Sequence, residues 1–189
     1  MNHIQMMKLM WNNSIGDISY PLYIFFERMI IMIKEIKGNI FNYIEEGDVL
    51  LHQVNCMGVM GGGIAYTIRQ LFPNVYTTYA NYVRSQDDDR DLLGQNLFVQ
   101  TKYKGKNFTI GNCFGQYTCS SSKQETIYDA LCDAFIKAAN AYPNSRILIP
   151  KNIGCGLAGG DWNRVSKFIE SIFYNHEVLL VDFDGSKLN

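Results

Sequence analysis

Residues 50–65 constrain the fold of this chain more than any other stretch. They begin as an apolar run, pass through Asn55 and reach three consecutive glycines, Gly61–Gly63. Apolar residues then recur at helical spacing from Ile64 to Phe72. A strand that passes through a glycine-rich turn into a helix is typical of anion sites in α/β proteins. Glycines let backbone N–H groups approach an oxyanion, and the helix N-terminus adds partial positive charge.

A second stretch, residues 147–162, repeats this order near the other end of the chain. The apolar run Ile147–Ile149 leads into a turn rich in glycine, and a helix is expected to start at Asp161. Two such loops, far apart in the sequence, indicate two walls of one cleft. A cleft of this kind suits a ligand with more than one phosphate.

Strands and helices alternate along the chain, which predicts a layered α/β fold with helices on both faces of a sheet. Lys104–Lys106 is expected to form a hairpin turn, Asn74 to cap a helix, and residues 113–123 to form a functional loop. We expect strands at residues 30–36, 49–54, 96–103, 107–112, 146–149 and 178–183, and helices at 64–72, 74–83, 125–142 and 161–173.

Composition limits the classes of function. A chain of 189 residues is expected to form one main domain, and its net charge of -1 argues against a strong nucleic-acid footprint. The five cysteines are scattered without a C-x-x-C pair, and the three histidines are far apart. We therefore expect reduced thiols in a cytoplasmic protein and no metal site.

The N-terminal segment is treated separately from the domain. Its apolar part, residues 18–33, is too short and too interrupted by charge and proline to predict a membrane span or a secretory signal. We interpret residues 1–29 as an arm and residues 30–189 as the domain. Translation from Met29 or Met32 is a further hypothesis, which the intact mass of the native protein would test.

Three motifs occur in order: residues 37–40 (Lys-Gly-Asn-Ile), residues 54–65, and residues 149–162 with Gly-Cys-Gly-Leu-Ala-Gly-Gly-Asp-Trp. Together they resemble the macro domain family over about residues 30–183. The chain is most similar to the branch of stand-alone ADP-ribose-1''-phosphate phosphatases and phage or bacterial macro domain proteins. This resemblance implies a three-layer α/β/α fold with a central mixed sheet and a cleft for ADP-ribose, without a cofactor.

The resemblance also assigns ligand contacts. Asn39 stands where many members place an Asp that accepts a hydrogen bond from adenine, although Asn39 can also cap a turn. Gly61–Gly63 and Gly154–Gly156 would hold the diphosphate, and the alternative is that they form tight turns. The helix after Gly63 lacks a Ser, Thr or Asp cap, which favours binding. The expected ligand-binding residues are Asn39, Ile40, Asn55, Cys56, Met57, Met60, Gly61, Gly62, Gly63, Ile64, Ala65, Phe114, Gln116, Ile153, Gly154, Cys155, Gly156, Leu157 and Ala158.

At the distal end of such a ligand, Asn55 would orient the ribose by resemblance. Phe114, Gln116 and Tyr117 would cover that ribose from the loop after Asn112, with a core position as the alternative for Phe114. Cys155 is interpreted as filling space under its loop, and neither Cys56 nor Cys155 has a cationic partner in the sequence that would activate its thiol.

The catalytic candidates are Asp161, Asn55 and His52. Asp161 opens a helix, so it is either an N-cap or a carboxylate that orients an attacking water. His52 is interpreted as a core histidine bonded to a backbone carbonyl, with proton transfer as the alternative.

These residues support three hypotheses. The first is metal-independent removal of phosphate from ADP-ribose 1''-phosphate. The second is a glycohydrolase that removes ADP-ribose from protein or nucleic acid; one such branch uses a lysine near Cys113 and an aspartate where this chain has Ala158, so the covalent lysine route is disfavoured. The third is a non-catalytic ADP-ribose reader. In each case we expect a monomer that binds ADP-ribose or a derivative. We expect no association with a membrane.

Overall fold

A six-stranded sheet forms the centre of the fold in the computed structural model, which describes residues 33–120 and 123–188. Its strand order is β1-β6-β5-β2-β4-β3. The strands are β1 (Ile33–Lys37), β2 (Val49–Asn55), β3 (Asn96–Tyr103), β4 (Lys106–Gln116), β5 (Ile147–Pro150) and β6 (Val178–Asp182). The helices are α3 (Gly63–Leu71), α4 (Pro73–Arg84), α5 (Tyr128–Ala141) and α6 (Trp162–Ile172), with short 3-10 helices η1 (Ile40–Tyr43) and η2 (Asp89–Leu92).

All neighbouring strands run parallel except β3, which is antiparallel to β4. The predicted hairpin turn between β3 and β4 is confirmed: Lys104 and Gly105 both have positive φ, at 47° and 85°. Two successive residues of this kind match the twist of a tight hairpin. The sheet is therefore mixed, as expected.

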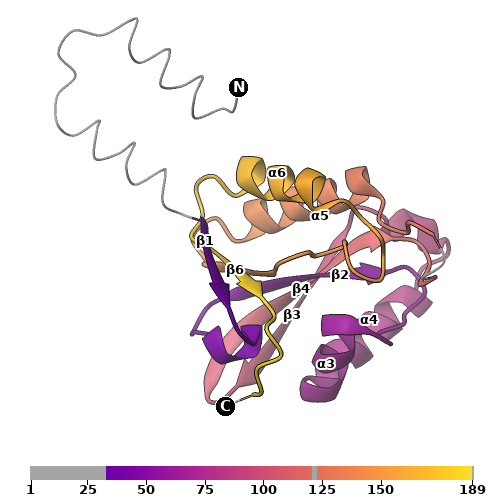
Figure 1. Cartoon of the computed structure of the whole chain (residues 1–189). Coiled ribbons are helices and arrows are strands. Elements are labelled where there is room, and N and C mark those ends of the chain that lie inside the picture. Colours follow the sequence, from indigo (N-terminus) through magenta and orange to yellow (C-terminus); the bar gives the residue numbers. More distant parts are fainter. Residues whose placement is uncertain (1–32, 121–122, 189) are drawn as a thin grey trace, which may run out of the picture. The chain divides into compact units, whose positions relative to one another are not determined.

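Helices cover both faces of the sheet, so the three-layer α/β/α fold is confirmed (Figure 1). Successive side chains of β2 point to opposite faces. Leu50 and Val54 belong to the apolar core that includes residues of α3 and α4. Val49 and Leu51 belong to the core under α5 and α6. Because both faces of β2 are covered, its sequence is a continuous apolar run rather than an alternating one.

Some expected boundaries were wrong. Strand β4 continues to Gln116, so Cys113 and Phe114 lie in the sheet rather than in a loop. Asn74 does not cap α4, which begins one residue earlier with Pro73 in its first turn. The Asn74 side chain instead bonds to β3, donating to the carbonyl of Gln100 at 3.3 Å.

Strands β2 and β5 pair over two positions, Val49 with Ile147 and Leu50 with Leu148. Beyond these pairs the two strands separate, while β2 remains paired with β4 along its whole length. The sheet therefore opens between β2 and β5 toward their carboxyl ends, and each of these ends leads into a glycine-rich loop.

The described residues belong to one compact unit, Met32–Asn189. Within them, no helix has the length and apolar character needed to cross a membrane. All five cysteines are free thiols. The proposed start sites Met29 and Met32, and the arm before them, lie outside the described residues.

Candidate functional site

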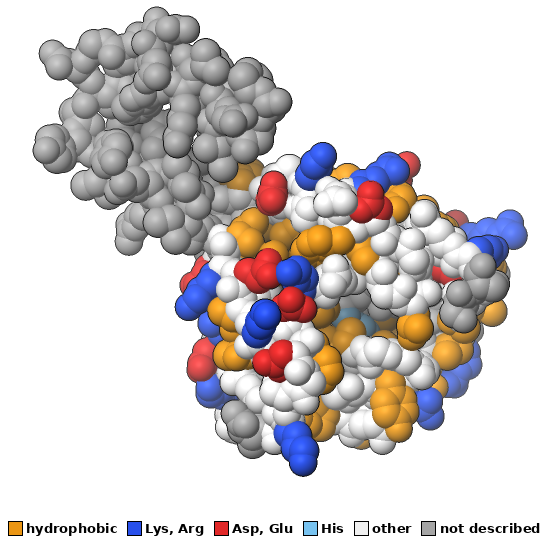
Figure 2. Space-filling model, viewed as in Figure 1, with side chains coloured by type: hydrophobic (Ala, Val, Ile, Leu, Met, Phe, Trp, Pro, Cys, Tyr) orange, Lys and Arg blue, Asp and Glu red, His pale blue; other side chains and the backbone are white. Residues whose placement is uncertain are grey.

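A cavity of about 790 Å³ lies at the carboxyl ends of the parallel strands. Its walls include the first glycine loop (residues 56–62, after β2) and the second glycine loop (residues 151–161, after β5). The two loops meet closely, because a Cβ atom at Gly62 would lie 2.7 Å from Leu157 Cδ1. Figure 2 shows this face of the molecule, where mainly apolar and uncharged side chains surround the central hollow. The structure thus brings the two glycine stretches to one cavity.

The first glycine loop presents unpaired backbone donors to this cavity. Helix α3 begins at Gly63 without a side-chain cap, and its first internal bond is donated by Tyr66 to Gly62 at 3.2 Å. The N–H groups of residues 61–65 have no acceptor within the described part of the chain. Such N–H groups at a helix start, with the helix dipole behind them, form an anion-binding site.

The second glycine loop leaves donors free in the same way. Its turn is closed by backbone bonds that include those from Cys155 to Asn152 at 2.8 Å, from Gly159 to Gly156 at 3.0 Å and from Gly160 to Gly154 at 2.9 Å. Gly154 has φ of 72°, a conformation that favours glycine. The N–H groups of Gly154, Gly156, Leu157 and Ala158 donate to no acceptor among the described residues. Leu157 is 66% exposed at the rim of the cavity.

Asn39 and Phe183 mark one end of the cavity, beside β1 and β6. Asn39 caps η1, its Oδ1 accepting from the Phe41 N–H at 3.2 Å, while its Nδ2 donates to the Ser186 carbonyl at 3.3 Å. Its oxygen retains a second lone pair. Phe183 is 67% exposed, which makes its ring available for stacking. Phe183 was not predicted as a site residue, because it was expected to lie in the last strand.

Asn55 lies in the wall beside β2 and β4, where its side chain organises the first glycine loop. Its Oδ1 accepts from the N–H groups of Met57 at 3.0 Å and Val59 at 3.2 Å. Its Nδ2 donates to the Val59 carbonyl at 2.7 Å. The Tyr79 hydroxyl lies 2.6 Å from the Asn55 carbonyl and 3.0 Å from Oδ1. One Nδ2 hydrogen remains for a ligand.

His52 does not line the cavity. It is fully buried, and its Nε2 lies 2.9 Å from Asn112 Oδ1. The partner is therefore a side-chain amide and not the expected backbone carbonyl. Because Asn112 Nδ2 donates to the Leu97 carbonyl, its oxygen faces His52, and the His52 Nε2–H donates to it. Burial lowers the pKa of His52 to about 4, so the ring is neutral at pH 7.

Asp161 also lies outside the cavity lining. Its carboxylate caps α6 by accepting from the Asn163 N–H at 2.9 Å, and the residue is exposed. Its own N–H donates to the Tyr128 hydroxyl at 2.9 Å. These contacts match the N-cap interpretation.

The remaining expected residues divide into two groups. In the lining are Asn39, Ile40, Asn55, Gly61, Gly62, Gly63, Ile64, Ala65, Gln116, Ile153, Gly154, Gly156, Leu157 and Ala158. Outside it are Cys56, Met57, Met60, Phe114 and Cys155. Phe114 is fully buried in the core, because β4 extends through it. Burial raises the pKa of the Cys56 thiol to about 12 and of Cys155 to about 11, so neither is activated.

Further lining residues near the end of β4 were not predicted from the sequence. Gln53, Cys119 and Ser120 line the cavity there with Gln116. Gln53 carried no recognisable signal, because it sits within an apolar strand pattern. Among the described residues, the lining contains no carboxylate and no imidazole.

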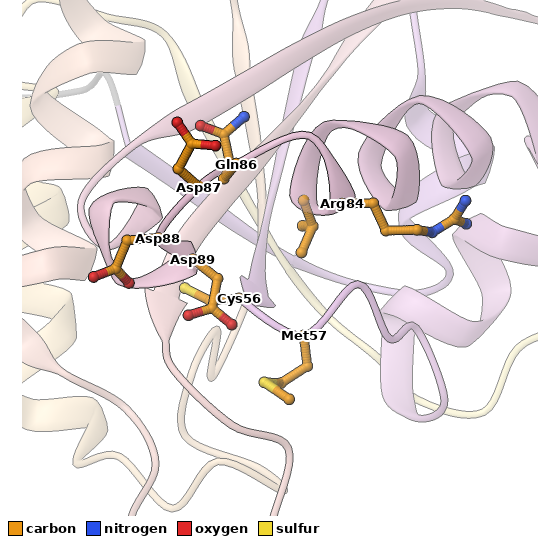
Figure 3. A pocket seen from close by; sticks show the side chains of 8 residues that line it. Cys56, Met57, Arg84, Gln86, Asp87, Asp88 and Asp89 are labelled. Atoms are coloured by element: carbon orange, nitrogen blue, oxygen red, sulfur yellow. The ribbon is translucent and has the colours of Figure 1, made fainter.

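A second, shallower pocket of about 400 Å³ lies between the start of the first glycine loop, the end of α4 and residues 86–89 (Figure 3). Cys56 and Met57 line it together with Asp87, Asp88 and Asp89. No group of three or more potential metal ligands occurs in the residues that the structure covers. Two of these carboxylates have hydrogen-bond partners within the protein: Asp88 accepts from the Arg90 N–H at 2.9 Å and Asp89 from the Tyr117 hydroxyl at 2.8 Å.

Comparisons with known proteins agree with this architecture. The chain is 25% identical over 158 residues to an uncharacterized 17.5 kDa protein of Enterobacteria phage T4, covering 82% of this chain and 98% of the phage protein. It is 34% identical over 76 residues to an ADP-ribose 1''-phosphate phosphatase of Scheffersomyces stipitis, covering 38% of this chain and 44% of that one. It is 27% identical over 127 residues to a DNA ADP-ribosyl glycohydrolase of Mycobacterium tuberculosis, covering 67% and 35%.

Solved structures share the fold. The macrodomain of Mycobacterium tuberculosis DarG superposes with a TM-score of 0.65 at 23% identity, covering 82% of this chain and 99% of that one. Thermosipho africanus DarTG in complex with ADP-ribose gives a TM-score of 0.63 at 16% identity, covering 85% and 44%. Residues 51–169 match the family described as Macro domain, and with the motifs in the expected order and the expected fold, this chain belongs to the macro domain family.

Proposed function

We propose that this protein binds ADP-ribose derivatives and hydrolyses the substituent on the distal ribose, with ADP-ribose 1''-phosphate as its substrate. The products would be ADP-ribose and inorganic phosphate. The proposal is supported by the cavity and by the similarity to a phosphatase of that specificity.

One observation carries the proposal: unpaired amides of two loops border one cavity. Residues 61–65, together with Gly154 and residues 156–158, provide donors from two directions. A diphosphate between them would be held by backbone dipoles. Local dipoles are needed because a net charge of -1 provides no general positive field to attract an anion. Of the described residues in the lining, Lys151 alone has a charged side chain, and it is paired with Glu35 and with Asp182 at 3.4 Å.

The order of the strands sets the direction of the ligand. Along the carboxyl edge of the sheet, β1 and β6 come first, then β5, β2 and β4. The diphosphate between the loops after β5 and β2 therefore has Asn39 and Phe183 on one side and Asn55 and Gln116 on the other. We place adenine with the first pair, because Phe183 offers a ring face and Asn39 an acceptor, and the distal ribose with the second pair.

Turnover would depend on electrostatic stabilisation more than on a side-chain base. Loop N–H groups that the diphosphate does not use would stabilise the charge that develops on the 1''-phosphate as water attacks it. The proposal assigns no step to Asp161 or His52, since both lie outside the lining. Asn55 would hold the distal ribose through its remaining Nδ2 hydrogen.

The test is phosphate release from ADP-ribose 1''-phosphate, compared between the natural protein and Gly156→Val. A Cβ atom at Gly156 meets nothing within 4 Å, so the variant should fold. Its side chain would stand in the space beside the free amides and should abolish ADP-ribose binding and turnover. Ala141→Val, at an exposed position at the end of α5, is the control. Equal turnover by both variants would refute the assignment of the cavity.

A second candidate is removal of ADP-ribose from a macromolecule. The similarity to the mycobacterial DNA ADP-ribosyl glycohydrolase favours it. Cys113, in the region where one such branch uses a lysine, is fully buried, and burial raises the pKa of its thiol. We therefore consider only a water-based route. Release of labelled ADP-ribose from modified DNA or protein, without phosphate release, would favour this candidate, and binding without any product would indicate a reader.

The biological setting follows from the same proposal. Five free thiols suit a reducing compartment such as the cytoplasm. The proposed site is formed by one chain, so a monomer suffices, and we propose residues 30–189 as the functional domain.

A further inference from the structure

Gln53 lies in the cavity wall where β2, β4 and the second glycine loop meet. It is half-buried and lines the cavity. Its side chain makes hydrogen bonds to Gln116 and Thr126, so it connects two walls of the cavity. The orientation of its amide follows from the groups at the two ends of this network.

The first end is the carbonyl of Thr118. Gln116 Nε2 lies 2.6 Å from this oxygen, which can only accept. The nitrogen of Gln116 therefore faces Thr118, and its Oε1 faces Gln53. Because an amide oxygen can only accept, the group of Gln53 that lies 2.8 Å from it must be the donor Nε2.

The second end is the carbonyl of Gly154. The Thr126 hydroxyl lies 2.5 Å from this oxygen and donates its single hydrogen to it. The Thr126 oxygen must then accept from Gln53, whose Nε2 lies 3.0 Å away. Both ends thus assign the same orientation independently, and both hydrogens of Nε2 are used.

Among the residues that the structure describes, the oxygen of Gln53 has no donor that is not already committed elsewhere. The hydroxyl nearest to Oε1, that of Thr126, is 3.4 Å away and already donates to Gly154. Two glycines pack closely against this oxygen and only the lack of a Cβ atom makes room for it: such an atom would lie 2.5 Å from Oε1 at Gly154 and 2.7 Å at Gly115. An amide oxygen at a cavity wall needs a donor, which is water in the empty cavity and can be a ligand hydroxyl in the occupied one.

We propose that Gln53 Oε1 accepts a hydrogen bond from a hydroxyl group of the distal sugar and so makes the cavity prefer ADP-ribose to ADP. This inference rests on the proposed function, which places that sugar beside Gln116, a direct partner of Gln53. Gln53 is then a residue that sets specificity, in addition to supporting the loop through Thr126.

The test compares two ligands that differ in the distal sugar. Calorimetric titration of ADP-ribose and ADP would be made on the natural protein and on Gln53→Met, which has a similar length but no polar group. The affinity for ADP-ribose should fall about 10-fold more than that for ADP, as expected for one hydrogen bond to a neutral group, because any loss of loop support weakens both ligands by the same factor. Equal weakening of both ligands would overturn the proposal, because loss of loop support acts on the shared diphosphate.

Thr126→Val is the matched control. It removes the support of the Gly154 carbonyl but leaves Gln53 in place, so both ligands should weaken by the same factor. A loss of preference for ADP-ribose as large as in Gln53→Met would overturn the proposal. ADP-ribose analogues that lack one distal hydroxyl test the natural protein directly, even if a variant does not fold. One analogue should bind about 10-fold more weakly, and equal binding of all analogues would contradict the inference. A natural protein that binds neither ADP-ribose nor ADP would instead refute the proposed function.

Discussion

The hydroxyl of Tyr79 should stabilise the protein by holding the end of β2 beside the cavity. This hydroxyl is 2.6 Å from the Asn55 carbonyl and 3.0 Å from Asn55 Oδ1, and the residue is fully buried. Tyr79→Phe removes one hydrogen bond and leaves these acceptors short of a donor, while the ring still packs against Phe114. We expect the free energy of unfolding to fall by about 1–2 kcal/mol.

Urea unfolding would measure this change. With a denaturant slope of about 2 kcal/mol/M, the midpoint should shift by about 0.5–1 M at unchanged slope. Tyr82→Phe is the matched control on the same helix, because the Tyr82 ring also packs on Phe114, at 6.2 Å between centroids. The Tyr82 hydroxyl has no hydrogen bond within the described residues, so we expect a shift within about 0.5 kcal/mol. Equal shifts in the two variants would show that the reasoning about Tyr79 is wrong.

Two further predictions concern the residues outside the cavity. Burial lowers the pKa of His52 to about 4 from 6.5, so the unfolded chain takes up this proton first as the pH falls. The natural protein should lose up to about 3 kcal/mol of stability between pH 6.5 and pH 4, and His52→Gln should lose less in urea unfolding; parallel pH profiles would contradict this. Asp161→Ala should lower the free energy of unfolding by about 1 kcal/mol because it removes the cap of α6, and Asp161→Ser should largely restore that stability. The affinity for ADP-ribose should stay unchanged in Asp161→Ala. A large loss of affinity would place Asp161 in the site.

Periodicity in the sequence was enough to predict the alternation of strands and helices. The apolar run of β2 and the helical spacing after Gly63 identified the centre of the fold, and the resemblance supplied the mixed sheet. Phe114 was assigned to a loop because residues 113–123, which include Gly115, are rich in Gly, Ser and Gln. In the structure, the register of β2 and β4 shifts at this point, and the strand continues. A glycine within a strand and one that ends a strand give the same local signal.

The site was harder to predict where it depends on long-range contacts. Both glycine loops were found, because the residue type itself carries the signal. Gln53 and Phe183 were missed, because their importance depends on partners and openings that strand packing creates. Asp161 remained ambiguous, since a carboxylate at a helix start has the same sequence pattern whether it faces a cavity or solvent. Only the placement of α6 distinguishes these cases.

The early separation of β2 from β5 has a consequence for how a ligand would act on the whole molecule. After Leu50 and Leu148 the two central strands no longer share a ladder, and the space at their ends is bordered by main-chain donors. A diphosphate bound there would accept hydrogen bonds from both loops. It would thereby link the β1-β6-β5 part of the sheet to the β2-β4-β3 part. Ligand binding would therefore slow the local unfolding of the most buried strands, in addition to reducing the motion of the two glycine loops.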